Sequence, residues 1–84
     1  KGIIEYNEEN VLLTKNELSI LTYLLENRGK VVSRDDLMSY LWDSEMFVDD
    51  NTLTVNITRL RKKLEELGFN DVIETRRGWG YIIL

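Results

Sequence analysis

One segment constrains the fold of this chain more than any other, an apolar repeat at helical spacing through residues 50–67. At about 100° per residue, its apolar side chains fall on a single helix face. These residues are Leu53, Ile57, Leu60, Leu64 and Leu67. Asp49 or Asp50 can cap the first turn, and Gly68 can end the helix. We therefore expect a long third helix that is buried along one side.

Two shorter helices are predicted before it. The first begins with the capping box at residues 14–17, Thr-Lys-Asn-Glu, and ends before Gly29. Its expected buried face is Leu18, Leu21, Leu24 and Leu25. The second begins after Ser33 and closes at Trp42. Its expected buried face is Leu37, Tyr40 and Leu41. Residues 31–32 between the helices are long enough only for one β-bridge.

Short β-rich segments flank the helices. We expect strands at residues 2–6 and 11–13 around a polar turn, and at 72–75 and 80–84 around an Arg-Arg-Gly-Trp tip at residues 76–79. A lone hairpin is only marginally stable, so the first pair must lean on the helices. The order hairpin, helix, helix, long helix, hairpin predicts one α+β domain over residues 1–84, a winged helix-turn-helix with three helices and a C-terminal hairpin wing.

Composition excludes several function classes. The 84 residues include no Cys and no His, which rules out disulfides and thiolate metal sites and removes the commonest general base. Nothing singles out a carboxylate pair for acid–base work, and the acidic loop 43–49 lacks the glycine of a calcium loop. No apolar run approaches the roughly 20 residues of a membrane span. We predict a cytoplasmic, non-catalytic module with no metal, no cofactor and no membrane contact.

The charge distribution favours a polyanionic partner despite a net charge of −4. Residues 51–64 contain four basic residues and no acid. These are Arg59, Arg61, Lys62 and Lys63. Binding depends on the local field rather than on the net charge. About five basic side chains on one face predict that log affinity for DNA falls with log salt at a slope of about −4 to −5.

The exposed face of the third helix carries the residue types that read a major groove. Opposite the apolar stripe lie Asn51, Val55, Thr58 and Lys62, with Thr54, Arg59 and Arg61 on the flanks. Val can contact a thymine methyl, Asn and Thr can bond base edges, and Arg and Lys reach guanine or phosphate. An exposed helix with a solvated basic stripe is the plain alternative. The Arg-bearing hairpin tip, with Arg76 and Arg77 beside Gly78, favours the DNA-binding interpretation because such arginines suit a narrow minor groove.

Four motifs resemble the OmpR/PhoB-type response-regulator effector domain. Residues 48–64 read VDDNTLTVNITRLRKKL, residues 73–81 read IETRRGWGY, residues 13–17 read LTKNE and residues 30–34 read KVVSR. The resemblance covers essentially the whole chain. The third helix is most similar to the Gram-positive subgroup linked to resistance against bacitracin and cationic peptides. It implies a DNA-binding domain that follows a phosphorylatable receiver domain absent from these 84 residues.

The resemblance also assigns roles to individual residues. It places Thr54, Val55, Thr58 and Arg59 toward bases or nearby phosphates, and Asn51, Arg61 and Lys62 toward phosphates. Thr75 and Arg77 match wing positions, with Arg77 in the minor groove and Arg76 beside it. The family's remaining phosphate-contact positions correspond to Arg34, Trp42 and Tyr81.

The resemblance further implies several partners. It implies a direct-repeat DNA operator, a second copy bound head to tail, RNA polymerase at loop 43–49, and a sensor histidine kinase acting on the receiver.

The sequence departs from the family pattern in two respects. The family's N-terminal sheet has four strands, so we expect it to be truncated here, and the family often has a basic residue at positions 51 and 58. The alternative is a winged-helix module that contacts proteins only; a flat salt response would favour it.

Overall fold

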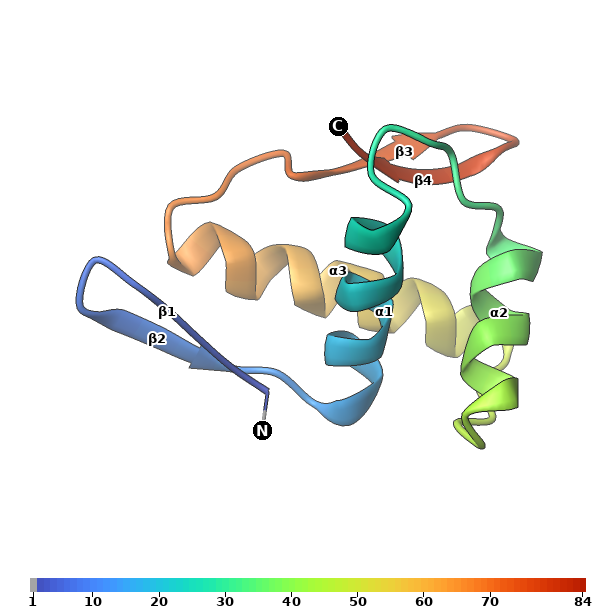
Figure 1. Cartoon of the computed structure of the whole chain (residues 1–84), viewed down its shortest axis with the longest axis horizontal. Helices are drawn as coiled ribbons and strands as arrows, with labels where there is room; N and C mark the ends of the chain where they lie inside the picture. Colours follow the sequence, from blue (N-terminus) through green and yellow to red (C-terminus); the bar gives the residue numbers. More distant parts are fainter. Residues whose placement is uncertain (1) are drawn as a thin grey trace.

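The computed structural model describes residues 2–84 and confirms the predicted α+β winged-helix order. The elements are β1 (Ile3–Tyr6), β2 (Glu9–Leu12), α1 (Lys15–Glu26), α2 (Arg34–Asp43), α3 (Asp50–Glu66), β3 (Ile73–Arg76) and β4 (Gly80–Ile83). Figure 1 shows α1 crossing α3, with α2 beside the N-terminal half of α3. The β1–β2 hairpin lies by the other half of α3, and the β3–β4 hairpin extends above the helices. No helix in the described part of the chain is long and apolar enough to cross a membrane.

The N-terminal hairpin has a tighter turn than the sequence predicted. β1 and β2 pair antiparallel with Tyr6 opposite Glu9, so the connection is two residues long. Asn7 and Glu8 both adopt positive φ, at 53° and 66°, which matches the right-handed twist of the flanking strands. The expected polar turn over residues 7–10 was therefore too long, because Glu9 and Asn10 belong to β2.

This hairpin leans on α3, as expected for a pair of strands that is marginal alone. The ring centroids of Tyr6 and Phe69 lie 4.7 Å apart, and Phe69 follows the end of α3. From within α3, Nζ of Lys63 donates a 2.9 Å hydrogen bond to the backbone oxygen of Leu12. The contacts fix the hairpin at the end of the domain opposite α2 (Figure 1).

The helix boundaries follow from the predicted caps. Both bonds of the capping box form between Thr14 and Glu17, and the Ser33 hydroxyl accepts from the amide of Asp36. Asp49, rather than Asp50, caps α3 by accepting a 2.7 Å hydrogen bond from the amide of Thr52. This choice leaves the side chain of Asp50 free for a contact outside its own helix.

The core confirms the apolar stripe of α3 and corrects that of α1. All five predicted α3 residues are buried. In α1, Leu25 is 46% exposed, whereas Ile20 is fully buried. The buried positions 17, 20, 21 and 24 form the helical face, and position 25 falls beside it. In α2, Leu37 and Leu41 are fully buried, and Tyr40 is only partly buried, stacked on Tyr23 at 4.3 Å.

The C-terminal hairpin is anchored to the segment that precedes α2. The predicted single β-bridge forms between Val32 and Tyr81. Gly80 makes this approach possible, since a Cβ at that position would lie 2.0 Å from the Val32 backbone oxygen. The tip is shorter than predicted because Arg76 pairs with Gly80 inside the ladder, which leaves Arg77, Gly78 and Trp79 in the turn. We call β3, this turn and β4 the wing.

Candidate nucleic-acid interface

The face of α3 opposite the core presents the side chains that the sequence predicted. Exposed along it are Asn51, Thr54, Val55, Thr58, Arg59 and Lys62. Val55, the apolar residue of this face, is 43% exposed. Asn56, by contrast, is buried and donates to the Thr52 backbone oxygen, so it belongs to the inner side. The helix therefore offers one apolar contact surrounded by small polar and basic groups.

The threonine hydroxyls on this face are oriented by the helix itself. Oγ1 of Thr58 donates a 3.0 Å hydrogen bond to the backbone oxygen of Thr54. Oγ1 of Thr54 donates in the same way to Asp50, at 3.4 Å, and accepts from Arg34 at 2.8 Å. The Thr58 oxygen keeps its capacity to accept a further bond, whereas that of Thr54 is engaged by Arg34.

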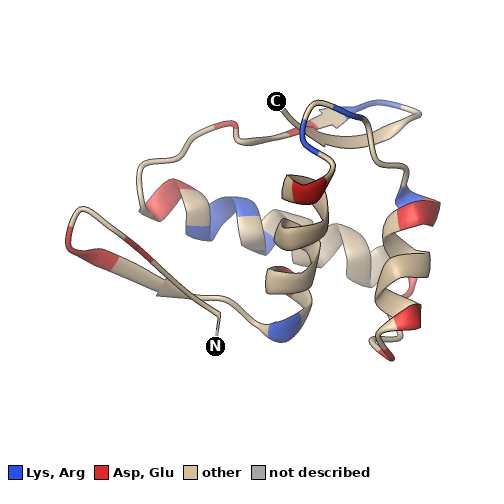
Figure 2. Ribbon diagram, in the orientation of Figure 1, with Lys and Arg blue, Asp and Glu red and all other residues tan. Residues whose placement is uncertain are grey.

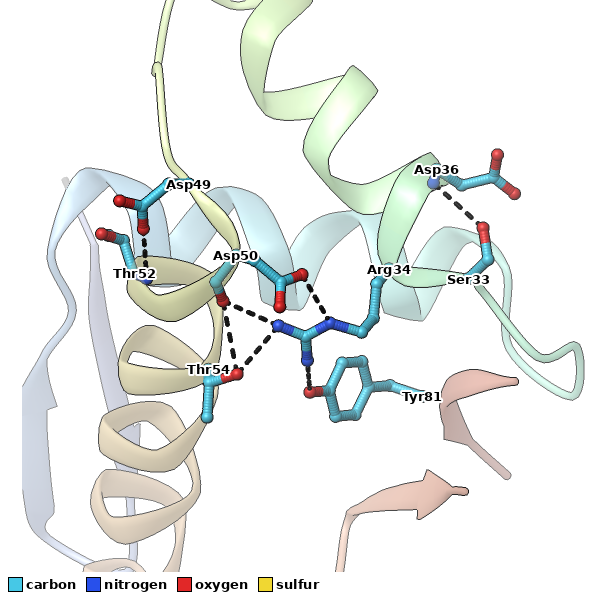
Figure 3. A network of polar contacts seen from close by, with 8 residues as sticks. All are labelled: Ser33, Arg34, Asp36, Asp49, Asp50, Thr52, Thr54 and Tyr81. Carbon is cyan, nitrogen blue, oxygen red and sulfur yellow. Dashed lines mark hydrogen bonds and ion pairs between the residues drawn. The ribbon is translucent and has the colours of Figure 1, made fainter. Parts of the chain in front are cut away.

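Arg34, the first residue of α2, joins three elements through its guanidinium group (Figure 3). Nε lies 3.0 Å from Oδ1 of Asp50, and Nη2 donates to the Asp50 backbone oxygen at 2.7 Å as well as to Thr54. Nη1 donates to the hydroxyl of Tyr81 on β4. The side-chain hydrogen bond to Asp50 is the main reason that the pKa of Arg34 is raised above its ordinary value.

Tyr81 and Arg61 hold the wing against α3. The ring of Tyr81 is buried, and the guanidinium carbons of Arg34 and Arg61 lie 5.8 and 5.9 Å from its centroid, within the range of a cation–π contact. Arg61 also donates to the Ile73 backbone oxygen at 3.0 Å and to the hydroxyl of Thr75. Two predicted phosphate contacts, Arg61 and Tyr81, thus hold the interface elements together in this structure.

The wing tip carries an exposed cation and an exposed indole. Arg76 pairs with Glu74 at 3.0 Å, whereas Arg77 makes no ion pair within residues 2–84. Trp79 is 75% exposed. A pocket of about 380 Å³ opens between the wing and the start of α2, lined by Arg34, Arg76 and Trp79 among others. Sequence reasoning did not select Trp79; its position between two glycines at a hairpin tip was the available signal.

Only part of the predicted basic segment faces this surface. Arg59, Lys62 and Arg77 are exposed and form no ion pair with any described residue. Lys63 is directed the other way, to Glu17 on α1 at 2.6 Å. Figure 2 shows basic residues along the middle of α3 and in the wing, and acidic residues on the β1–β2 hairpin and at the C-terminal end of α3. Fewer free cations therefore lie on this surface than the sequence count implied, because Lys63 is directed to α1 and Arg76 is paired with Glu74.

Trp42 lies away from the wing, where it organises the loop after α2. It is 53% exposed, Nε1 donates a 3.0 Å hydrogen bond to the Val48 backbone oxygen, and its ring meets that of Phe47 edge-on at 5.0 Å. Phe47 is 67% exposed. The helix α2 ends at Asp43, one residue later than predicted, and the loop that follows it carries an exposed aromatic side chain beside Trp42. Within the described residues, its acids form no cluster able to hold a metal ion.

Comparison with known proteins places the chain among transcriptional regulators. The family model for "Transcriptional regulatory protein, C terminal" matches residues 7–83. The response regulator protein GraR of Staphylococcus aureus (strain MRSA252) is 48% identical over 82 residues. That alignment covers 98% of this chain but 37% of GraR, so the chain spans about a third of the length of such relatives.

Solved structures resemble this chain over almost its full length. The C-terminal domain of the nisin resistance regulator NsrR, a lantibiotic response regulator, superposes with a TM-score of 0.90 at 44% identity, covering 98% of this chain and 84% of that one. The Klebsiella pneumoniae RstA DNA-binding domain, solved in complex with the RstA box, has a TM-score of 0.76 at 31% identity, covering 96% and 81%.

Proposed function

Because this chain belongs to the family of transcriptional regulatory protein C-terminal domains, of the OmpR/PhoB type, we propose that it binds double-stranded DNA in a sequence-specific manner and controls transcription. The supporting observation is the shared surface of α3 and the wing, on which Arg59, Lys62 and Arg77 are exposed without an acidic partner in the described chain. RstA, of the same fold, was solved on its DNA box.

In this proposal α3 enters the major groove and the wing reaches the adjacent minor groove. The exposed methyl groups of Val55 meet a thymine methyl, while Thr58 and Arg59 reach base edges or neighbouring phosphates. Asn51 and Lys62 lie at the phosphate side of the groove, and Arg77 enters the minor groove. Trp79, two residues after Arg77 in the same turn and 75% exposed, is then close to the same groove.

The domain is proposed to be the output part of a longer two-component response regulator that acts in the cytoplasm. Phosphorylation of a receiver domain by a sensor histidine kinase pairs two copies, which bind a direct repeat head to tail. GraR is a response regulator, and NsrR is a nisin resistance regulator. By this likeness we assign the regulated genes to resistance against peptides that act on the cell envelope.

Loop 43–49 is proposed as the contact for RNA polymerase. The loop and the adjoining end of α2 combine the exposed rings of Phe47 and Trp42 with the carboxylates of Glu45 and Asp43, which suits a partner surface with basic and apolar groups. The alternative, a module that contacts only proteins, rests on this same surface and on the net acidity of the chain.

Selection from a random duplex pool tests the proposal. The 84-residue chain is incubated with the pool at low salt, bound duplexes are amplified over several rounds, and affinity is measured by fluorescence anisotropy for the enriched sequence and for a scrambled duplex of the same composition. We expect one motif to be enriched and to bind about 10³-fold or more tightly than the scrambled control. Absence of duplex binding at low salt would instead support the protein-contact alternative.

A further inference from the structure

The guanidinium group of Arg34 has little capacity left for DNA. Arginine has five N–H donors, and four are engaged here, by Oδ1 and the backbone oxygen of Asp50, by the Thr54 hydroxyl and by the Tyr81 hydroxyl (Figure 3). A bidentate bond to a phosphate, the geometry in which arginine binds phosphate best, needs two free donors. Such a bond therefore requires that at least one of the present contacts be broken.

The charge of Arg34 is also cancelled locally. The Asp50 carboxylate is 3.0 Å from Nε, and its side chain is 70% exposed on the same side of the domain. A phosphate that approaches Arg34 would meet this carboxylate as well, so attraction and repulsion act at the same place. The cations Arg59, Lys62 and Arg77 differ in this respect, because none has an acidic partner among the described residues.

The contacts of Arg34 lie at the junction of the interface elements. Asp50 is the first residue of α3, Thr54 lies one turn further on its exposed face, and Tyr81 is on the second strand of the wing. A single side chain from α2 thus fixes the start of α3 relative to the wing. A change in this link moves the base-reading face and the wing relative to each other, without removing a charge that faces DNA.

We propose that Arg34 is a positioning residue that holds α3 and the wing in register, and that Asp50 is a specificity-determining residue that keeps Arg34 from the phosphates of any duplex. The pair raises the ratio of cognate to non-cognate affinity rather than the affinity for DNA in general. This inference rests on the proposed function, and it replaces the phosphate contact that family resemblance implies for Arg34.

The variant Arg34→Lys tests the first half, because lysine keeps the charge but has a single nitrogen that cannot span the four acceptors. We expect affinity for the selected duplex to fall about tenfold, with less than about a twofold change on the scrambled duplex and an unchanged salt slope. In the matched control Lys62→Ala, both affinities fall alike and the slope flattens by about 0.9. Retention of both affinities in Arg34→Lys, or an equal loss on both, would overturn the proposal.

The variant Asp50→Asn tests the second half and decides the matter if Arg34→Lys is unfolded at the assay temperature. Removing the negative charge beside Arg34 should steepen the salt slope on the scrambled duplex by about 0.9 and lower the cognate-to-scrambled ratio. Asp35→Asn, which removes an exposed acid beside Arg34 with no bond to it, is the matched control. Equal changes in the two variants would reduce Asp50 to a general field effect and overturn its role. Wild type that binds neither duplex would refute the proposed function itself.

Discussion

Nζ of Lys63 lies 2.6 Å from Oε1 of Glu17, a contact that ties the second half of α3 to the first turn of α1. The Glu17 side chain is 1% exposed, and its Oε1 also accepts from the amide of Thr14, while Oε2 has no hydrogen-bond partner among residues 2–84. One carboxylate thus completes the α1 cap and neutralises a cation of α3. Lys63 belongs to the core side of α3, although it adjoins Lys62 in sequence.

Lys63→Ala should lower the free energy of unfolding by about 2–3 kcal/mol, because it leaves a buried carboxylate without its cation. The value lies below that of a fully buried pair because the Lys63 side chain is 28% exposed. Urea denaturation measures the loss. The salt slope of the folded variant on duplex DNA should equal that of wild type; a flatter slope would place Lys63 at the phosphates after all.

The salt dependence of a single domain on duplex DNA should be weaker than the sequence count implied. On the surface formed by α3 and the wing, three exposed cations have no acidic partner among the described residues: Arg59, Lys62 and Arg77. They predict a slope of about −2.7, at roughly 0.9 per phosphate contact. Anisotropy titrations between about 50 and 200 mM salt measure it. A slope of −4 to −5 would mean that Arg34, Arg61 or Arg76 leaves its intramolecular partner on binding.

The helix caps and the core could be predicted from the sequence, whereas the directions of the charged side chains could not. Caps and apolar spacing are local properties, so Thr14, Ser33 and the α3 stripe were predicted correctly. The direction of a long charged side chain depends instead on what the fold places next to it. Glu17 is 46 residues from Lys63, and Arg34 is 47 from Tyr81. No local pattern indicates such pairs, so the sequence alone could not show that Lys63 is directed to Glu17 or that Arg34 is bound to Tyr81.

Val55→Ala should separate binding from stability. The side chain is 43% exposed and opposite the core, so the free energy of unfolding should change by no more than about 0.5 kcal/mol. Affinity for the selected duplex should weaken by about 1 kcal/mol through the lost methyl contact, with little change on a scrambled duplex. Thermal unfolding and anisotropy on the same samples provide both readouts. Equal affinity of variant and wild type for the selected duplex would exclude Val55 from base contact.

The cap of α3 should make stability depend on acidic pH. The pKa of Asp49 lies below its ordinary value of 3.8, mainly because the carboxylate accepts a hydrogen bond from the backbone amide of Thr52 and, to a smaller extent, one from the Thr52 side chain. A carboxyl with a lowered folded-state pKa contributes stability that is present above pH 3.8 and is lost as pH falls through the folded value. An asparagine side chain at the same position caps without titrating. As the pH is lowered from about 6 to about 2.5, the wild type should therefore lose more of its thermal midpoint than Asp49→Asn does. A difference between the two midpoints that stays constant with pH would contradict this.

Arg77→Ala should weaken binding in a manner that depends on the sequence beside the operator core. Arg77 is exposed in the three-residue turn of the wing and has no ion pair within residues 2–84, so its removal should leave the fold intact. A·T-rich tracts have a narrow minor groove with enhanced negative potential, which attracts an inserted arginine. The loss of affinity should therefore be greater on an A·T-rich flank than on a G·C-rich one.

Lys62→Ala, which removes a cation from the major-groove side, is the matched control and should weaken binding equally on both flanks. Affinities of the three proteins for two operators that differ only in that flank decide the matter. Equal losses for Arg77→Ala on both flanks would make it an ordinary phosphate contact, and no loss on either would remove the wing from the interface.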